Sequence, residues 1–206
     1  MKSNISILFI VSTLFLFACA NQQDEVVTIS TDYGDIKVIL YDQTPKHKAN
    51  FLKLAKEKFY DSTAFHRVIY GFMIQGGDIN SRTNADPNSW GQGNPDYTIP
   101  LEVNTNLMHH KGALAAARKP DQVNPNKESN GSQFYIVQNW KGEHRLNMEY
   151  TVFGQVISGI EVVDSLAQQP VNDLARPLKD IRMKMTVTPM KRTEITEKFG
   201  YIYPKE

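Results

Sequence analysis

The sequence predicts a β-rich domain of the α+β class. Short runs of β-branched and aromatic residues recur along the chain, turn-forming residues separate them, and helical spacing of apolar residues appears in two segments. The 206 residues suit one domain with tails and are enough to bury a substantial core. No internal repeat or low-complexity tract interrupts this pattern.

The N-terminal residues indicate a targeting segment that precedes the domain. Lys2 supplies a positive charge, and the apolar run at residues 5–17 is too short to span a bilayer comfortably. This run ends in Leu-Phe-Ala-Cys at residues 16–19, which resembles a bacterial lipobox, in which the cysteine is diacylated. The resemblance implies a lipoprotein signal peptide over residues 1–18 and lipid attachment at Cys19. An ordinary secretory signal is the alternative.

The composition argues against several kinds of partner. With 23 basic and 22 acidic residues, the chain lacks the basic surface that nucleic acid or an anionic membrane would attract. Membrane contact would therefore come from the lipid alone. His109 and His110 are adjacent, point opposite ways on an extended chain and have no Cys or HExxH partner set. We therefore expect no metal and no cofactor.

The first half of the domain predicts a hairpin and then a helix. Two β-rich runs, 26–31 and 35–41, flank a turn at 32–34. Thr44 followed by Pro45 predicts a helix start, and the helical spacing of apolar residues that follows predicts an amphipathic helix packed on the core.

Residues 65–78 predict two short strands joined by a turn at Gly71. Strand alternation places Met73 and Gln75 on one face of the second strand. Phe72 has the wrong parity to join them unless the glycine turn re-aims it. An exposed edge hairpin with solvent-facing polar residues is the alternative explanation of this segment taken alone.

The remaining segments follow the same turn, strand and cap signals. They are a long loop at 80–100, a surface loop at 119–128, strands at 132–137 and 151–157, a helix that begins with the Ser-x-x-Glu spacing of 158–161 and stops at Pro170, a strand at 181–187 and a charged tail.

The string Phe-His-Arg-Val-Ile-Tyr-Gly-Phe-Met-Ile-Gln-Gly-Gly-Asp at 65–78 resembles the signature of the cyclophilin family of peptidyl-prolyl cis-trans isomerases. The resemblance continues, in the family's order, through 112–118, 130–136 and 150–154. It implies a mainly β fold, a closed eight-stranded antiparallel barrel capped by two α-helices.

This resemblance also implies a domain organisation. The isomerase domain would cover residues 26–190, preceded by a tether at 19–25 and followed by a C-terminal tail at 191–206.

The resemblance further implies the site. Arg67 would be catalytic, because a guanidinium is permanently charged, planar and rich in donors. The implied substrate-binding residues are a proline pocket of Phe72, Met73, Tyr135 and Leu146, backbone-binding amides of Gln75 and Gln133, and groove residues Ala117 and Arg118.

Three residues depart from the family pattern. Tyr135 stands where the family usually has Phe, Tyr150 replaces a histidine, and Arg145 replaces a tryptophan associated with tight cyclosporin binding. None of these changes affects Arg67, so the implied reaction class is the same.

The sequence thus predicts a peptidyl-prolyl cis-trans isomerase that assists the folding of exported proteins. Its partners would be proline-containing polypeptide clients, and we expect a monomer. The lipid would anchor it in the bacterial cell envelope, at the outer membrane, facing the periplasm or the surface. One alternative is a non-enzymatic proline-binding chaperone or adhesin module. A hydrolase is a weaker alternative, because no GxSxG motif or Ser-His-acid arrangement is visible.

Overall fold

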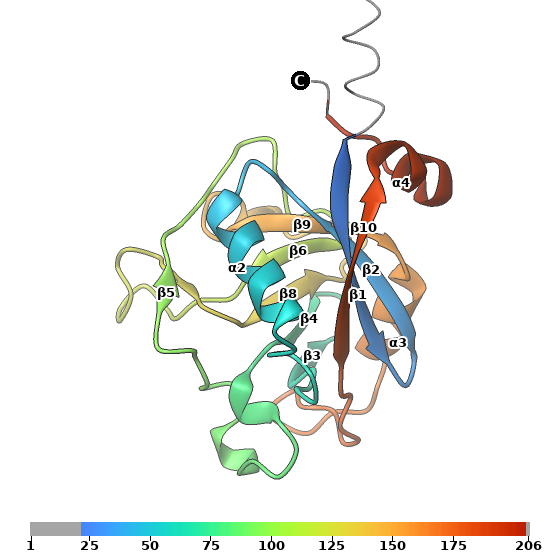
Figure 1. The fold of residues 1–206 in the computed structure, drawn as a ribbon. Helices are drawn as coiled ribbons and strands as arrows, with labels where there is room; N and C mark the ends of the chain where they lie inside the picture. The colour runs from blue at the N-terminus through green and yellow to red at the C-terminus, as the bar shows by residue number, and fades with distance from the viewer. Residues whose placement is uncertain (1–21, 205–206) are drawn as a thin grey trace, which may run out of the picture.

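A computed structural model describes residues 22–204 of the chain, and its main feature is an eight-stranded antiparallel sheet (Figure 1). The strand order is β10-β1-β2-β9-β6-β8-β4-β3. The strands are β1 (Gln23–Thr31), β2 (Gly34–Leu40), β3 (Arg67–Ile69), β4 (Met73–Gly76), β6 (Ala113–Ala116), β8 (Phe134–Val137), β9 (Val152–Ser158) and β10 (Lys184–Lys191). A separate pair joins β5 (Thr98–Ile99) to β7 (Ser129–Asn130).

The strand pairing is that of a sheet with two end strands, not of the fully closed barrel that the resemblance implies. Within residues 22–204, β10 and β3 share no strand ladder. The segments that precede them meet through an isolated bridge between Ala64 and Arg182, and the Phe65 N–H donates to the Ile181 carbonyl at 2.9 Å. Because β3 has only three residues, little of its outer edge can pair.

Two helices pack against the same core from separate parts of the chain. α2 (Pro45–Lys56) begins with proline at its first turn, as predicted, and buries Phe51 and Leu54. The N-cap of α3 (Ile160–Ala167) is Gly159, one residue later than the predicted cap, since Ser158 is the last residue of β9. Gly159 makes the turn between them with a φ of 86°, and a Cβ there would lie 2.1 Å from the Asp35 carbonyl oxygen. Only glycine fits this turn.

The C-terminal tail, to which we assigned no secondary structure from the sequence, forms a third described helix, α4 (Arg192–Phe199). The prediction of two helices was therefore wrong. α4 lies at the end of β10, beside the start of β1 (Figure 1). Ile195 is fully buried against Val26 and Ile39, which is why this short helix holds its place. Lys191 pairs with Gln23, so β1 begins inside the segment expected to be a tether.

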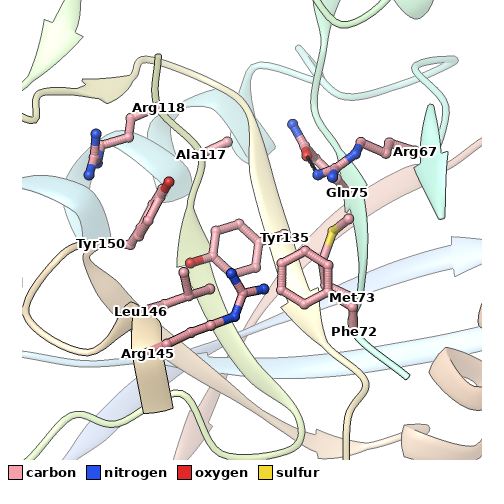
Figure 2. A pocket seen from close by; sticks show the side chains of 10 residues that line it. All are labelled: Arg67, Phe72, Met73, Gln75, Ala117, Arg118, Tyr135, Arg145, Leu146 and Tyr150. Atoms are coloured by element: carbon pink, nitrogen blue, oxygen red, sulfur yellow. Dashed lines mark hydrogen bonds between the residues drawn. The ribbon is translucent and has the colours of Figure 1, made fainter. Parts of the chain in front are cut away.

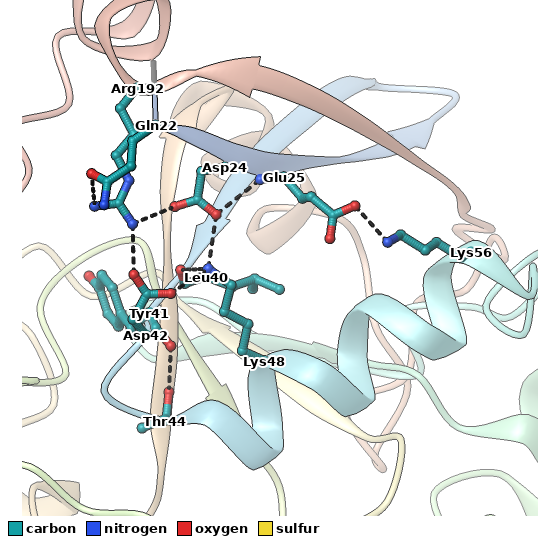
Figure 3. Close-up of polar contacts among 10 residues, drawn as sticks. All are labelled: Gln22, Asp24, Glu25, Leu40, Tyr41, Asp42, Thr44, Lys48, Lys56 and Arg192. Atoms are coloured by element: carbon teal, nitrogen blue, oxygen red, sulfur yellow. Dashed lines mark hydrogen bonds and ion pairs between the residues drawn. The ribbon is translucent and has the colours of Figure 1, made fainter. Parts of the chain in front are cut away.

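Charged side chains fix this end of the molecule, which Figure 3 shows in detail. Arg192 contacts the carboxylates of Asp42 at 2.7 Å and Asp24 at 3.8 Å, and Lys48 contacts the same two carboxylates at 2.8 and 2.9 Å. We call these four residues the C-terminal charge cluster. In the described part of the chain, no helix is long and apolar enough to cross a membrane.

Candidate active site

A cavity of about 350 Å³ opens on one side of the sheet (Figure 2). All of the predicted site residues except Gln133 line it, and Cys19 lies outside the described residues. The lining residues are Arg67, Phe72, Met73, Gln75, Ala117, Arg118, Tyr135, Arg145, Leu146 and Tyr150. The structure thus brings together residues from four distant segments, while their individual roles stay predictions.

Strand register aligns the polar part of the site. Arg67 of β3 is the direct cross-strand partner of Gln75 in β4, which is in turn the partner of Tyr135 in β8. Directly opposed residues point to the same face of an antiparallel sheet. Register therefore places a guanidinium, an amide and an aromatic ring in a row along the cavity.

The apolar part of the site comes from a turn and a helical wall. Gly71 has a φ of 74°, and Phe72, in the turn before β4, lines the cavity together with Met73, as a re-aiming glycine turn would allow. Leu146 comes from the short 3₁₀ helix η3 (His144–Leu146) on the opposite side (Figure 2). Met73 is 1% exposed and Tyr135 is 5% exposed. These surfaces suit a compact apolar ring, because aromatic faces and a flexible thioether adapt to it.

Arg67 faces a neutral partner. Its Nη1 donates to the Gln75 Oε1 at 3.3 Å, and its Cζ lies 5.9 Å from the centre of the Phe72 ring. Burial lowers the pKa of Arg67, and the nearby Tyr150 opposes this. The group still carries its charge at neutral pH, because the ordinary pKa of arginine is far above 7.

The other two arginines of the cavity are paired with carboxylates. Arg118 binds Asp121 and lies 3.5 Å from a Glu149 oxygen, and Arg145 donates to Glu143 at 3.1 Å. Within residues 22–204, Arg67 is the cavity arginine that has no carboxylate partner. Its charge is therefore the one left for a ligand.

Gln133 lies behind the cavity and does not line it. Its Oε1 accepts a hydrogen bond from Gln75 Nε2 at 3.0 Å, and its Nε2 donates to the carbonyls of Gly93 at 2.7 Å and Gly91 at 3.2 Å. The side chain is 5% exposed. Gln133 therefore orients the amide of Gln75, whose free lone pair and free N–H remain for a substrate backbone.

Sequence reasoning missed two lining residues as members of the site. It treated Arg145 and Tyr150 only as departures from the family pattern, although Tyr150 opens the matching segment 150–154 and Arg145 lies five residues before it. The Arg145 guanidinium lies 5.0 Å from the centre of the Phe72 ring, and Tyr150 meets Tyr135 edge to face at 6.0 Å. The described residues contain no group of three or more His, Cys, Asp or Glu side chains that could hold a metal ion.

Comparison with known proteins gives one family. A sequence model described as cyclophilin type peptidyl-prolyl cis-trans isomerase/CLD matches residues 26–188. Peptidyl-prolyl cis-trans isomerase-like 3 of Dictyostelium discoideum is 41% identical over 161 residues, covering 77% of this chain and 91% of that protein.

Solved structures agree with this result. The crystal structure of a Cryptosporidium parvum cyclophilin type peptidyl-prolyl cis-trans isomerase matches with a TM-score of 0.69 at 34% identity, covering 81% of this chain and 98% of that chain. A second structure of that protein, in the presence of the dipeptide Ala-Pro, gives a TM-score of 0.67 at 33% identity, covering 79% and 98%.

Proposed function

The chain belongs to the cyclophilin-type peptidyl-prolyl cis-trans isomerase family and is such an isomerase, and from this premise we propose that Arg67 drives X-Pro rotation. Rotation must abolish amide resonance, against a barrier of about 18–20 kcal/mol. In the twisted state the proline nitrogen becomes pyramidal and regains a lone pair. A donor aimed at that nitrogen stabilises the twisted state more than either planar state, which is the requirement for catalysis.

The other cavity residues bind the substrate, some at the proline ring and some at the backbone. The proline ring packs between Phe72, Met73 and Leu146, with Tyr135 as the floor. Gln75 binds the substrate backbone through the half of its amide that Arg67 and Gln133 leave free. Fixing the substrate in this way removes orientational freedom before rotation, so positioning adds to the electrostatic effect. One structure of the Cryptosporidium relative was determined in the presence of the dipeptide Ala-Pro, which supports a proline-containing substrate.

The observation that carries the proposal is the neutral partner of Arg67. A guanidinium paired with a carboxylate has its field largely cancelled, whereas one that faces an amide retains it. At the half-buried position of Arg67, this field acts at short range on the nitrogen of a bound X-Pro bond.

The test is the substitution Arg67→Ala, assayed on a proline-containing tetrapeptide. We expect kcat/KM to fall by about 100-fold or more, as when one donor to a transition state is removed. Circular dichroism and thermal unfolding check that the variant folds. The matched control is Arg145→Ala, which removes an exposed, carboxylate-paired arginine of the same cavity, and we expect a fall of less than about fivefold.

The outcomes separate this mechanism from its rivals. Full turnover by folded Arg67→Ala protein would contradict the mechanism, and so would equal losses in the two variants. Wild-type protein that binds the peptide without accelerating rotation would support the alternative, a non-enzymatic proline-binding chaperone or adhesin module.

The proposal extends to the location of the protein. We propose that it assists the folding of exported proteins in a bacterial cell envelope, held by lipid at Cys19. Support comes from the apolar run and the Leu-Phe-Ala-Cys sequence of residues 16–19. Lipid chains bind by burial of their methylene groups, and stable anchoring needs more than one chain.

Mass spectrometry of the mature N-terminus, in a bacterial host, tests this part. The expected result is an acylated N-terminal Cys19, and Cys19→Ala should move the protein from the membrane fraction to the soluble fraction. A cleaved but unacylated N-terminus would support the ordinary secretory signal instead.

A further inference from the structure

The hydroxyl of Tyr135 contacts a buried histidine behind the cavity. The Tyr135 oxygen lies 2.9 Å from Nε2 of His109, and the two rings stack with 6.0 Å between centroids and 12° between planes. His109 is fully buried and does not line the cavity. His109, which the sequence analysis weighed only as a metal ligand, therefore supports Tyr135 from outside the cavity.

The hydrogen bonds of Asn147 fix the proton on the His109 ring. The Asn147 Oδ1 accepts the backbone N–H of His109 at 2.9 Å, which identifies that atom as the oxygen, because an amide nitrogen cannot accept this bond. The same oxygen lies 3.0 Å from Nδ1 of His109, so Nδ1 carries the proton. Nε2 is then the acceptor and the Tyr135 hydroxyl is the donor. Burial lowers the pKa of His109, although Asn147 and Glu143 oppose this, so the ring is neutral at pH 7.

His109 also holds both ends of the η3 wall. The backbone N–H of Glu143, just before η3, donates to the His109 carbonyl at 2.7 Å. Asn147, just after η3, receives the two donors described above. Arg145 and Leu146, which lie between these two anchors, form the cavity wall opposite Arg67 (Figure 2).

We propose that His109 is a positioning residue that joins the Tyr135 floor to the η3 wall and thereby sets the width of the proline pocket. This inference rests on the proposed function of the cavity. The joined surfaces touch the proline ring, whereas Arg67 and Gln75 come from β3 and β4. Loosening the joint therefore weakens substrate binding and leaves the rotation step at Arg67 in place.

The first test is Tyr135→Phe, which keeps the ring and removes the hydroxyl. We expect KM for the tetrapeptide to rise about threefold to tenfold, the effect of one hydrogen bond, with kcat changed less than about twofold. The matched control is Tyr60→Phe. That fully buried hydroxyl donates to the Ser132 carbonyl at 3.2 Å outside the cavity, so its loss should lower stability without changing KM.

The second test is a double-mutant cycle with His109→Leu. The Tyr135→Phe/His109→Leu protein should have a KM no higher than that of His109→Leu alone, because both changes break the same joint. His109→Gln, whose amide oxygen can accept the Tyr135 hydroxyl, should recover part of the loss. If His109→Leu does not fold, Tyr135→Phe with its control still decides the question.

Three results would overturn the inference: an unchanged KM in Tyr135→Phe, an equal rise in Tyr60→Phe, or single effects that multiply in the double variant. Nitrogen-15 NMR of the imidazole adds a direct check, since a proton found on Nε2 of His109 would also overturn it. Arg67→Ala in the same assay keeps the two proposals apart. A loss of kcat there, with no change in Tyr135→Phe, would refute only the role of His109.

Discussion

Two clusters of charged residues in this molecule differ in what faces the arginine. At the cavity, Arg67 faces the amide of Gln75 at 3.3 Å. In the C-terminal charge cluster, Arg192 faces the carboxylates of Asp42 and Asp24 (Figures 2 and 3). A cation with carboxylate partners stabilises the fold locally, whereas a cation that faces an amide keeps its field for a ligand.

The two clusters also differ in their place along the chain. Arg67 and the rest of the cavity lie within residues 26–188, the part that matches the family. Arg192 lies beyond that match and ties α4 to the start of β1 and to the segment between β2 and α2. From this comparison we expect the C-terminal charge cluster to contribute to the free energy of unfolding and Arg67 to contribute to turnover. The two contributions can be measured separately.

The largest expected effect comes from giving Arg67 the kind of partner that Arg192 has. Gln75→Glu places a carboxylate at the 3.3 Å position of the amide oxygen. We expect kcat/KM at pH 7 to fall by about 100-fold, because the new charge cancels the field of the guanidinium. The measurement is tetrapeptide isomerisation as a function of pH.

The pH dependence distinguishes charge from shape in this variant. Arg67 would hold the pKa of the introduced carboxyl below its ordinary value of about 4.3. Activity should therefore recover only as the pH falls below that value and the carboxyl becomes neutral. A loss that stays constant down to about pH 3 in folded protein would mean that the side-chain shape, and not its charge, is responsible.

The next effect concerns the C-terminal charge cluster. Asp24→Asn removes one carboxylate from beside Lys48 and Arg192, and Asp24 is only 6% exposed. We expect the free energy of unfolding to fall by about 2 kcal/mol, because two partly buried cations lose a partner. Urea titration measures the change, and kcat/KM should stay within about twofold of wild type. A loss of activity with unchanged stability would show that the two clusters are coupled.

The smallest effect is the acid dependence of stability at Asp42. Although burial raises the pKa of Asp42, hydrogen bonds and charges of Lys48 and Arg192 lower it overall from 3.8. A lowered folded-state pKa adds stability above the unfolded-state value, and this stability is lost as the pH falls through the folded-state value. Because the side chain is 62% exposed, the contribution should be below about 1 kcal/mol.

Asp42→Asn checks this expectation. The difference in unfolding free energy between pH 7 and about pH 2.5 should be smaller in the variant than in wild type. An identical pH dependence in the two proteins would mean that the ion pairs of Asp42 contribute nothing measurable.

The family resemblance implied most of the cavity residues, and local signals predicted the relative placement of those in one segment. In residues 65–78, the glycine turn and the strand alternation placed Phe72, Met73 and Gln75 correctly relative to one another, since backbone geometry over a few residues decides such placements. The α2 start was predictable for the same reason, because a proline at the first helical turn is a short-range signal.

Three other features depended on how distant segments pack together, which no single stretch of sequence reveals. They are the position of Gln133 beside Gln75, the joint between His109 and Tyr135, and the open ends of the sheet.

By itself the sequence determined the reaction class and the arginine on which we place it, because a fixed string of residues carries both. Only the tertiary structure decided which side chains face that arginine. It paired Arg118 and Arg145 with carboxylates, opposed Arg67 to an amide, and folded the unassigned tail into α4. The physical reason is that the strength of a charge depends on its neighbours in space, and folding brings those neighbours from remote parts of the chain.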